Sequence, residues 1–196
     1  GEDFGAGTVT IQNAGRLRIN TGGFVNNNGC FYANGSTLEY NNGAPFYTAG
    51  TEWYGGFASG RGVPYHVQVG VNTLNGTNLV LTGGTWRQLN GNMYIGPASG
   101  GSGYGLTLSS TFGGDLKIGG DWIRNGANAT FNPNNRAVFF IGSAGNQTIN
   151  VLGNGTETYH YIILNKPQGQ SLVLASTPAT NVTLTGGSSG GNSLLF

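Results

Sequence analysis

The sequence predicts an all-β protein that folds as a right-handed parallel β-helix of about eight coils, and three observations support this fold class. Short runs of β-branched and aromatic residues recur between clusters of Gly and Asn, which is the pattern of short strands and turns. No window has apolar residues at helical spacing, and Gly occupies 38 of the 196 positions, each costing a helix about 1 kcal/mol. Finally, a unit of the sequence recurs after about 98 residues.

Predicted strands follow one another from one end of the chain to the other. In the first half they are expected at residues 9–11, 17–19, 37–40, 66–69 and 78–81. In the second half they are expected at residues 106–108, 116–118, 137–141, 161–164, 171–174 and 182–184. We therefore expect no helix.

The repeat is clearest where two similar strands are each followed by a Gly pair. Leu17-Arg18-Ile19 matches Leu116-Lys117-Ile118, about 99 residues further along the chain. Residues 1–196 are thus expected to form one continuous solenoid, made of two related units at about 8–100 and 101–187 and the start of a third. Because the third unit stops at Phe196, the chain is interpreted as a fragment of a longer one.

The repeat length fits a solenoid. A unit of about 98 residues divides into about four coils of roughly 24 residues, and three short strands with their turns fill such a coil. Asn and Gly tolerate positive φ, which explains their abundance at the expected corners. Two tandem β-sandwich units of about 100 residues each would also produce this repeat and stay open as the alternative.

Alternation along the strands predicts which side chains fill the core. Arg18, Lys117 and Val80 are expected to point outward, and Cys30 is expected to be a reduced, buried thiol. The residues expected to point inward are Leu17, Ile19, Leu38, Leu79, Leu81, Leu116, Ile118, Val138, Leu172, Leu174 and Leu184.

Composition excludes several classes of function. Charged residues make up 8% of the chain and the net charge is +1, so no basic stripe is present to bind nucleic acid. The longest apolar stretches, such as residues 161–164, are too short to span a membrane. One cysteine allows no intrachain disulfide. Neither a calcium loop, a cluster of metal ligands nor a phosphate-binding Gly-Lys-Ser/Thr motif occurs, so no metal and no cofactor are expected.

No catalytic residues are predicted either. His66 and His160 each follow a tyrosine, but neither has a nucleophile in an elbow motif. The seven acidic residues are scattered, whereas a glycosidase needs two carboxyl groups facing one cleft. A structural role is therefore favoured over an enzyme, and a β-helix polysaccharide lyase or hydrolase is kept as the alternative.

One aromatic-rich segment predicts a contact surface. Residues 46–57 concentrate aromatic side chains, whereas the matching part of the second unit has none. Exposed aromatic rings stack on sugars or pack on partner chains, and polar neighbours bind hydroxyl groups. The predicted contact residues for a glycan or partner are Tyr47, Glu52, Trp53, Tyr54, Phe57 and Arg61. The competing interpretation is that these rings cap the core beneath a longer loop.

The second unit carries a set of short motifs, at residues 120–126, 130–133, 137–140, 147–149 and 161–166. With these motifs it resembles repeats in very large Gly/Asn/Thr-rich, adhesin-like surface proteins of Bacteroidota. The resemblance covers residues 106–187 and, more loosely, 8–82. It implies a secreted location on the bacterial cell surface, export by the type IX secretion system, and neighbouring copies or other surface proteins as partners.

The sequence thus predicts a structural and adhesive segment of a secreted surface protein, acting as a rigid repeat stalk or adhesin. A glycan-binding module is a further alternative, intermediate between a structural segment and an enzyme. Glycans are accordingly the ligand class expected at the aromatic segment.

Overall fold

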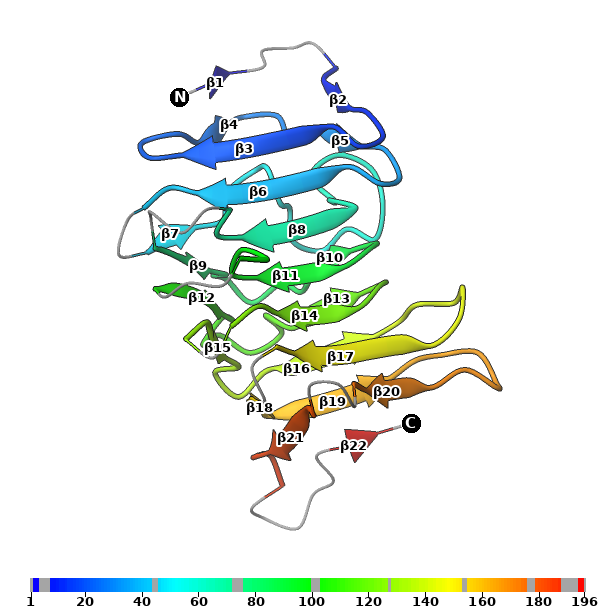
Figure 1. The fold of residues 1–196 in the computed structure, drawn as a ribbon. Coiled ribbons are helices and arrows are strands. Elements are labelled where there is room, and N and C mark those ends of the chain that lie inside the picture. Colours follow the sequence, from blue (N-terminus) through cyan, green and yellow to red (C-terminus); the bar gives the residue numbers. More distant parts are fainter. Residues whose placement is uncertain are drawn as a thin grey trace.

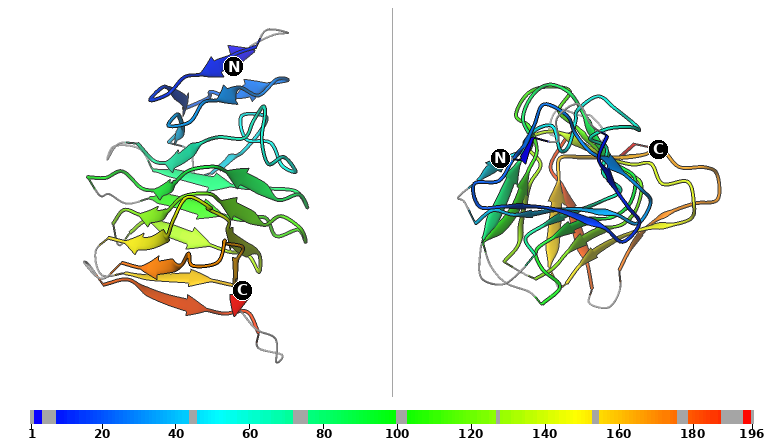
Figure 2. Two further views of the ribbon diagram at one scale, coloured as in Figure 1. Left: turned by 90° about the vertical axis from the view of Figure 1, so that its right-hand side faces the viewer. Right: turned by 90° about the horizontal axis from the view of Figure 1, so that it is seen from above.

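The computed structural model describes residues 2–3, 8–43, 46–71, 76–99, 103–126, 128–152, 155–175, 179–187 and 194–195. These residues form an all-β parallel solenoid and contain no helix (Figure 1). Strands of successive coils stack on three faces that surround a central core, as the view along the solenoid axis in Figure 2 shows. Every pair of named strands is parallel, which rules out the tandem β-sandwich alternative, because sandwich sheets are antiparallel.

The widest face is a seven-stranded sheet with the order β20-β17-β14-β11-β8-β6-β3. Its strands are β3 (Arg16–Asn20), β6 (Thr37–Asn41), β8 (His66–Val69), β11 (Met93–Ile95), β14 (Trp122–Arg124), β17 (Gln147–Val151) and β20 (Leu172–Leu174).

The second face is a five-stranded sheet with the order β10-β13-β16-β19-β22. Its strands are β10 (Arg87–Leu89), β13 (Leu116–Ile118), β16 (Ala137–Phe140), β19 (Tyr161–Leu164) and β22 (Leu194–Leu195).

The third face holds a four-stranded sheet and a further strand pair, and two short pairs lie near the N-terminus. The four-stranded sheet comprises β7 (Tyr47–Thr48), β9 (Thr77–Val80), β12 (Tyr104–Thr107) and β15 (Thr130–Asn132), and the further pair is β18 (Thr156–Tyr159) with β21 (Asn181–Leu184). Near the N-terminus β1 (Glu2–Asp3) pairs with β4 (Val25–Asn26), and β2 (Thr10–Ile11) pairs with β5 (Phe31–Tyr32).

The solenoid has about five turns, so the expectation of about eight coils is wrong. Each regular turn contributes one strand to each face, as in β8–β10, β11–β13, β14–β16, β17–β19 and β20–β22. Register partners in the seven-stranded sheet are 25 to 29 residues apart from Val67 through to Leu174. The coils are therefore longer than the expected 24 residues. A further irregular segment separates β7 from β8 and lengthens the chain without adding a turn.

The two segments linked by the sequence repeat lie on different faces. Leu17 belongs to β3 of the seven-stranded sheet, and Leu116 belongs to β13 of the five-stranded sheet. The sequence pattern that they share, a strand followed by two glycines, therefore marks a strand and the turn after it, and it occurs on both of these faces. Corner residues also adopt the expected positive φ, as Asn27 (62°) and Asn135 (59°) illustrate.

Side chains stacked between the three faces form one continuous apolar core. Ten of the eleven side chains expected to point inward are buried or pack against this core. The exception is Leu174, which is 46% exposed because β20 is the outermost strand of its sheet. Arg18, Lys117 and Val80 point away from the core as expected, and the free thiol of Cys30 is fully buried. Burial raises the pKa of that thiol to about 11.

The core also contains a buried ion pair that the sequence did not predict. Arg124 occupies an inward position of β14, in register with Ile95 and Val151 of the neighbouring coils. Its Nε donates to Glu157 Oε2 at 3.0 Å, and Trp122 Nε1 donates to the same oxygen at 2.8 Å. Arg124 further donates to the carbonyl oxygens of residues 129 and 156. These bonds compensate the desolvation of the guanidinium group.

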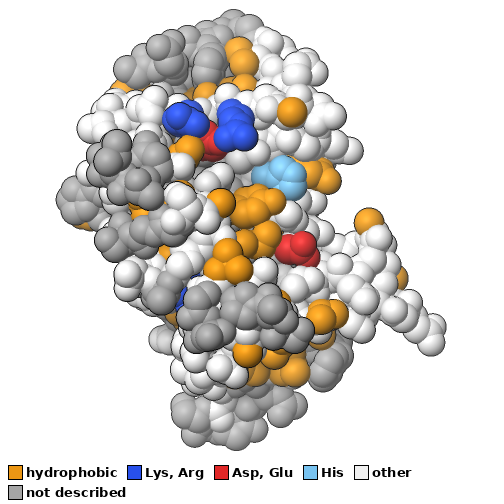
Figure 3. All heavy atoms as spheres, in the orientation of Figure 1, with side chains coloured by type: hydrophobic (Ala, Val, Ile, Leu, Met, Phe, Trp, Pro, Cys, Tyr) orange, Lys and Arg blue, Asp and Glu red, His pale blue; other side chains and the backbone are white. Residues whose placement is uncertain are grey.

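The outer surface of the seven-stranded sheet is polar near the N-terminus and more apolar further along. Arg16 and Arg18 hold the carboxylate of Glu39 at 2.6 and 2.7 Å. Further along the same outward column lie Tyr94 and Ile123. Figure 3 shows this face, with basic side chains towards the N-terminal end and hydrophobic side chains below them, beside an acidic side chain at mid-height.

Candidate functional site

The predicted aromatic contact set is divided by the structure, because Glu52 and Trp53 belong to the core. Trp53 is fully buried, and its Nε1 donates to the carbonyl oxygen of Gln88 at 2.8 Å. Glu52 is also fully buried and accepts hydrogen bonds from Gly50 N at 2.8 Å and from Tyr40 Oη at 3.1 Å. Burial raises the pKa of the Glu52 carboxyl above its ordinary value. Neither side chain is accessible to a ligand at the surface.

The other four members of that set keep some exposed surface. Phe57 is 54% exposed, and its ring centroid lies 6.0 Å from that of half-buried Tyr54. Arg61 lies over the Phe31 ring at 5.1 Å and donates to Thr8 Oγ1 at 3.1 Å. Tyr47 is half-buried and packs against the core. Tyr54 and Phe57 are thus the only members that the structure pairs through their rings.

The two histidines lie on different faces and each contacts a tyrosine. His66 begins β8, and its Nδ1 accepts a hydrogen bond from Asn92 N at 2.9 Å. Burial lowers the pKa of His66. His160 precedes β19, and its Nδ1 lies 3.2 Å from Thr185 Oγ1. The two rings therefore do not form one site.

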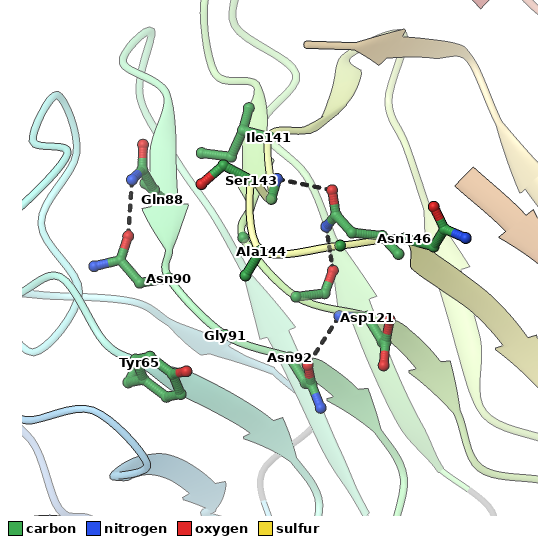
Figure 4. Close-up of a pocket in the computed structure, with 15 residues that line it drawn as sticks. Tyr65, Gln88, Asn90, Gly91, Asn92, Asp121, Ile141, Ser143, Ala144 and Asn146 are labelled. Carbon is green, nitrogen blue, oxygen red and sulfur yellow. Dashed lines mark hydrogen bonds between the residues drawn. The ribbon is translucent and has the colours of Figure 1, made fainter. Parts of the chain in front are cut away.

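A polar groove of about 460 Å³ lies at the corner between the five-stranded and seven-stranded sheets (Figure 4). Its walls come mainly from residues that connect β10 to β11, β13 to β14 and β16 to β17, and Tyr65 adds a wall from the segment before β8. It is lined by Tyr65, Gln88, Asn90, Gly91, Asn92, Gly119, Gly120, Asp121, Ile141, Gly142, Ser143, Ala144, Gly145, Asn146 and Gln147.

The groove is hollow because glycines of successive coils face one another at this corner. Gly120 N donates to Gly91 O at 2.7 Å, and a Cβ atom on Gly120 would lie only 2.7 Å from that same oxygen. Similarly, a Cβ atom on Gly142 would collide with the carbonyl oxygen of Gly119. Side chains are excluded by the close coil spacing, which leaves an open channel along the corner.

Side-chain amides and hydroxyl groups line this channel, and part of their hydrogen-bonding capacity is used to hold its shape. Asn92 Oδ1 accepts from Asp121 N at 2.9 Å, and Asp121 Oδ1 accepts from Thr148 N at 2.7 Å. Asn90 Oδ1 accepts from Gln88 Nε2 at 2.8 Å, and Asn146 Oδ1 accepts from Ser171 N at 2.8 Å. These hydrogen bonds fix the side-chain oxygens that accept them, and they thereby orient the side-chain amides of Asn90, Asn92 and Asn146.

Several donors and acceptors of the groove have no partner among the described residues. They are Asn90 Nδ2, Asn146 Nδ2, Asp121 Oδ2 and the hydroxyl groups of Tyr65 and Ser143. Such mixed donors and acceptors match the hydroxyl groups of a sugar, and the ring of Tyr65 adds an apolar surface. Asp121 is the only carboxylate among the lining residues, whereas glycoside hydrolysis uses two.

A lysine behind the groove holds one of its walls. Lys166 Nζ donates to Gly142 O at 2.8 Å, to Gly145 O at 3.1 Å and to Gln147 Oε1 at 2.9 Å. The ammonium group therefore ties together the loop between β16 and β17. Desolvation lowers the pKa of Lys166, and the nearby charge of Asp121 opposes this effect.

Sequence reasoning missed this groove because its residues are common throughout the chain. Asn90-Gly91-Asn92 and Gly119-Gly120-Asp121 each precede a strand of the seven-stranded sheet. Aligning the sequence coil by coil at the true intervals of 25 to 29 residues would have placed these two tripeptides side by side.

Within the described ranges no helix has the length and apolar character needed to cross a membrane. The same residues contain no group of three or more His, Cys, Asp or Glu side chains placed to hold a metal ion. Comparisons with protein-family models, with curated proteins and with solved structures found no match to this chain.

Proposed function

We propose that the chain is a structural and adhesive segment of a secreted bacterial cell-surface protein, and that it binds neutral glycans through the polar groove. The proposal retains the surface location, the type IX export route and the partner surface proteins implied by the resemblance to Bacteroidota adhesins. It also retains right-handed winding, since parallel crossovers are right-handed in nearly all known cases.

The observation that carries glycan binding is a set of polar groups that line an open groove and have no partner among the residues that the structure describes. A volume of about 460 Å³ falls within the range of small-molecule sites. The donors and acceptors come from four successive coils, whose backbones are joined by hydrogen bonds such as Gly120 N to Gly91 O at 2.7 Å and Gly119 N to Leu89 O at 2.9 Å. A ligand therefore meets groups whose positions are set before it binds, which lowers the entropic cost of binding.

The solenoid form supports the adhesive role. Each coil is hydrogen-bonded to its neighbours along three faces, which makes the body rigid along its axis. A single groove of exposed amide groups binds a sugar weakly, so attachment would depend on many copies acting together on one surface. A rigid body that spaces such grooves at fixed intervals is suited to this form of avidity.

Calorimetric titration with a panel of neutral oligosaccharides tests the proposal. We expect one or more members to bind, and Asn90→Ala combined with Asn146→Ala to weaken that binding by about tenfold, because each variant removes an amide that contacts the ligand. Asn181→Ala is the matched control, since Asn181 is an exposed amide at the start of β21 on another face.

Two outcomes would overturn the proposal. One is the absence of binding to every neutral oligosaccharide in the panel, and the other is unchanged binding in the double variant. Cleavage of a polysaccharide by the wild-type chain would instead support the lyase or hydrolase alternative.

A further inference from the structure

A second hollow, of about 350 Å³, lies on the outer side of the five-stranded sheet. Its lining includes Phe112, Asp115, Arg136, Phe139, His160 and Tyr161. These residues come from β16, β19 and the segments that precede β13, β16 and β19. None of them lines the polar groove, so the hollow is a separate feature.

Aromatic rings form the apolar part of this hollow. Phe112 is 88% exposed, the largest value among the exposed large hydrophobic side chains of the described residues. Phe139 points outward from β16 and is only half-buried, in contrast to its fully buried neighbours Val138 and Phe140. Half-buried Tyr161 lies edge-on to His160, with ring centroids 4.4 Å apart. Such rings are suited to stacking against the C–H face of a sugar.

Two cations at this face lack an acidic partner among the described residues. The Arg136 guanidinium lies 5.5 Å from the Phe112 ring centroid, and its only hydrogen bond to the described part of the chain runs from Nε to Asn134 O at 3.4 Å. The Lys117 ammonium lies 3.6 Å from the centroid of Trp86 and 5.9 Å from that of Phe139. By contrast, Arg16, Arg18 and Arg124 each pair with a glutamate.

Asp115 is the one carboxylate among the residues that line the hollow, and it contacts the backbone of β16 and neither of these cations. Its Oδ1 accepts a hydrogen bond from Ala137 N at 2.9 Å, which ties the loop before β13 to the start of β16. No ion pair joins Asp115 to Arg136 or Lys117. The two Nη atoms of Arg136 therefore stay available to an external anion.

We propose that this hollow is a second binding site, which takes the acidic sugars of a uronate-containing polysaccharide. The sugar ring would stack on the exposed aromatic surface, and its carboxylate would accept paired hydrogen bonds from the Nη atoms of Arg136, with Lys117 adding attraction along the sheet. Arginine suits this role because its planar fork matches a carboxylate and stacks on aromatic rings. The hollow has the volume of a small-ligand site, which favours one or two sugar units over a protein surface.

This second site rests on the proposed function and extends it to another class of glycan. Different variants test the groove and the hollow, so either site can be disproved without the other. The probe is a trigalacturonate, compared with the neutral trigalactoside of the same linkage, in calorimetric titrations at low and at high salt. We expect the trigalacturonate to bind more tightly and to lose affinity at high salt. Arg136→Gln should weaken its binding by about 10- to 100-fold, the range for a hydrogen bond to a charged group.

Three further variants separate the site from its surroundings. Arg136→Lys keeps the charge and should restore only part of the affinity, because it loses the fork geometry. Phe112→Ala removes the ring and should also weaken binding. Arg16→Gln is the charge control, since that guanidinium already pairs with Glu39 on the seven-stranded sheet, and it should change the affinity by no more than about twofold.

Equal affinity for the acidic and neutral sugars, or unchanged trigalacturonate binding in Arg136→Gln, would overturn the inference. A wild-type chain that binds no trigalacturonate would overturn it as well. In each case the groove proposal is judged by the Asn90 and Asn146 variants alone. Trigalacturonate binding that is lost in those groove variants and kept in Arg136→Gln would place the acidic ligand in the groove, against this inference.

Discussion

Replacing Trp53 with Ala should destabilise the fold strongly, because the structure places this side chain in the core. The indole ring has no exposed surface, and its Nε1 donates to Gln88 O at 2.8 Å in β10. Truncating a buried Trp costs about 3–5 kcal/mol through lost burial and the cavity left behind. For a chain of this size each kcal/mol lowers the melting temperature by about 2–4 °C. The expected decrease is therefore about 6 to 20 °C.

Thermal unfolding followed by circular dichroism measures this decrease, and two variants separate its causes. Trp53→Phe keeps most of the ring and removes the indole donor, so it should cost about 1–3 kcal/mol. Phe57→Ala is the exposed control and should change stability by about 0.5 kcal/mol or less, since that ring is 54% exposed. A melting temperature of Trp53→Ala within 2 °C of the wild type, by the same per-kcal/mol scale, would refute the assignment of Trp53 to the core.

The remaining predictions address the buried acid, the groove wall and the thiol. Burial raises the pKa of the Glu52 carboxyl, so the stability that Glu52 contributes is full below the unfolded pKa of about 4.3 and declines as the pH rises through the folded pKa. Urea unfolding should therefore show the Glu52→Gln variant gaining stability relative to the wild type from pH 4 to 8. Lys166→Met should accelerate amide hydrogen exchange at residues 143–147 and weaken neutral glycan binding, since it removes three hydrogen bonds; unchanged exchange would contradict the role of Lys166. Gly120→Ala should cost about 1–3 kcal/mol in thermal unfolding, because its Cβ would press on the carbonyl of Gly91; a neutral effect would argue against the close coil contact. Cys30, with a pKa of about 11, should react with a thiol reagent at least about 100-fold more slowly than the same thiol in denaturant, and rapid labelling of the native protein would contradict its burial.

Short-range sequence pattern was sufficient to predict the strands and most of the core. Alternation is a local property, so Leu38, Leu79 and Ile118 were identified as inward from their own strands. Similarly, Gly and Asn indicated the corners, because the tolerance of positive φ is a property of these residue types and does not depend on contacts with other coils. The fold class followed from these two local signals together with the repeat.

Features that depend on how coils stack were not predictable in this way. Arg124 lies two residues after buried Trp122, so alternation turns it inward, but only the stacking of the coils brings Glu157 from β18 close enough to compensate its charge. Trp53 lies in a segment without strand periodicity, so nothing local indicated which way the ring points. The polar groove likewise requires Gly91 and Gly120 to meet across two coils. In each case the deciding contact joins residues about 30 positions apart.

The central claim, that the polar groove binds neutral glycans, is tested most directly by NMR spectroscopy of the side-chain amides. Adding a neutral oligosaccharide that binds should shift the Nδ2 resonances of Asn90 and Asn146, because these groups have no protein partner among the described residues. The resonance of Asn125 should stay in place, since its buried Nδ2 donates to Gly96 O at 3.0 Å. Shifts confined to residues outside the groove, or no shift of Asn90 and Asn146 at saturating oligosaccharide, would contradict the claim.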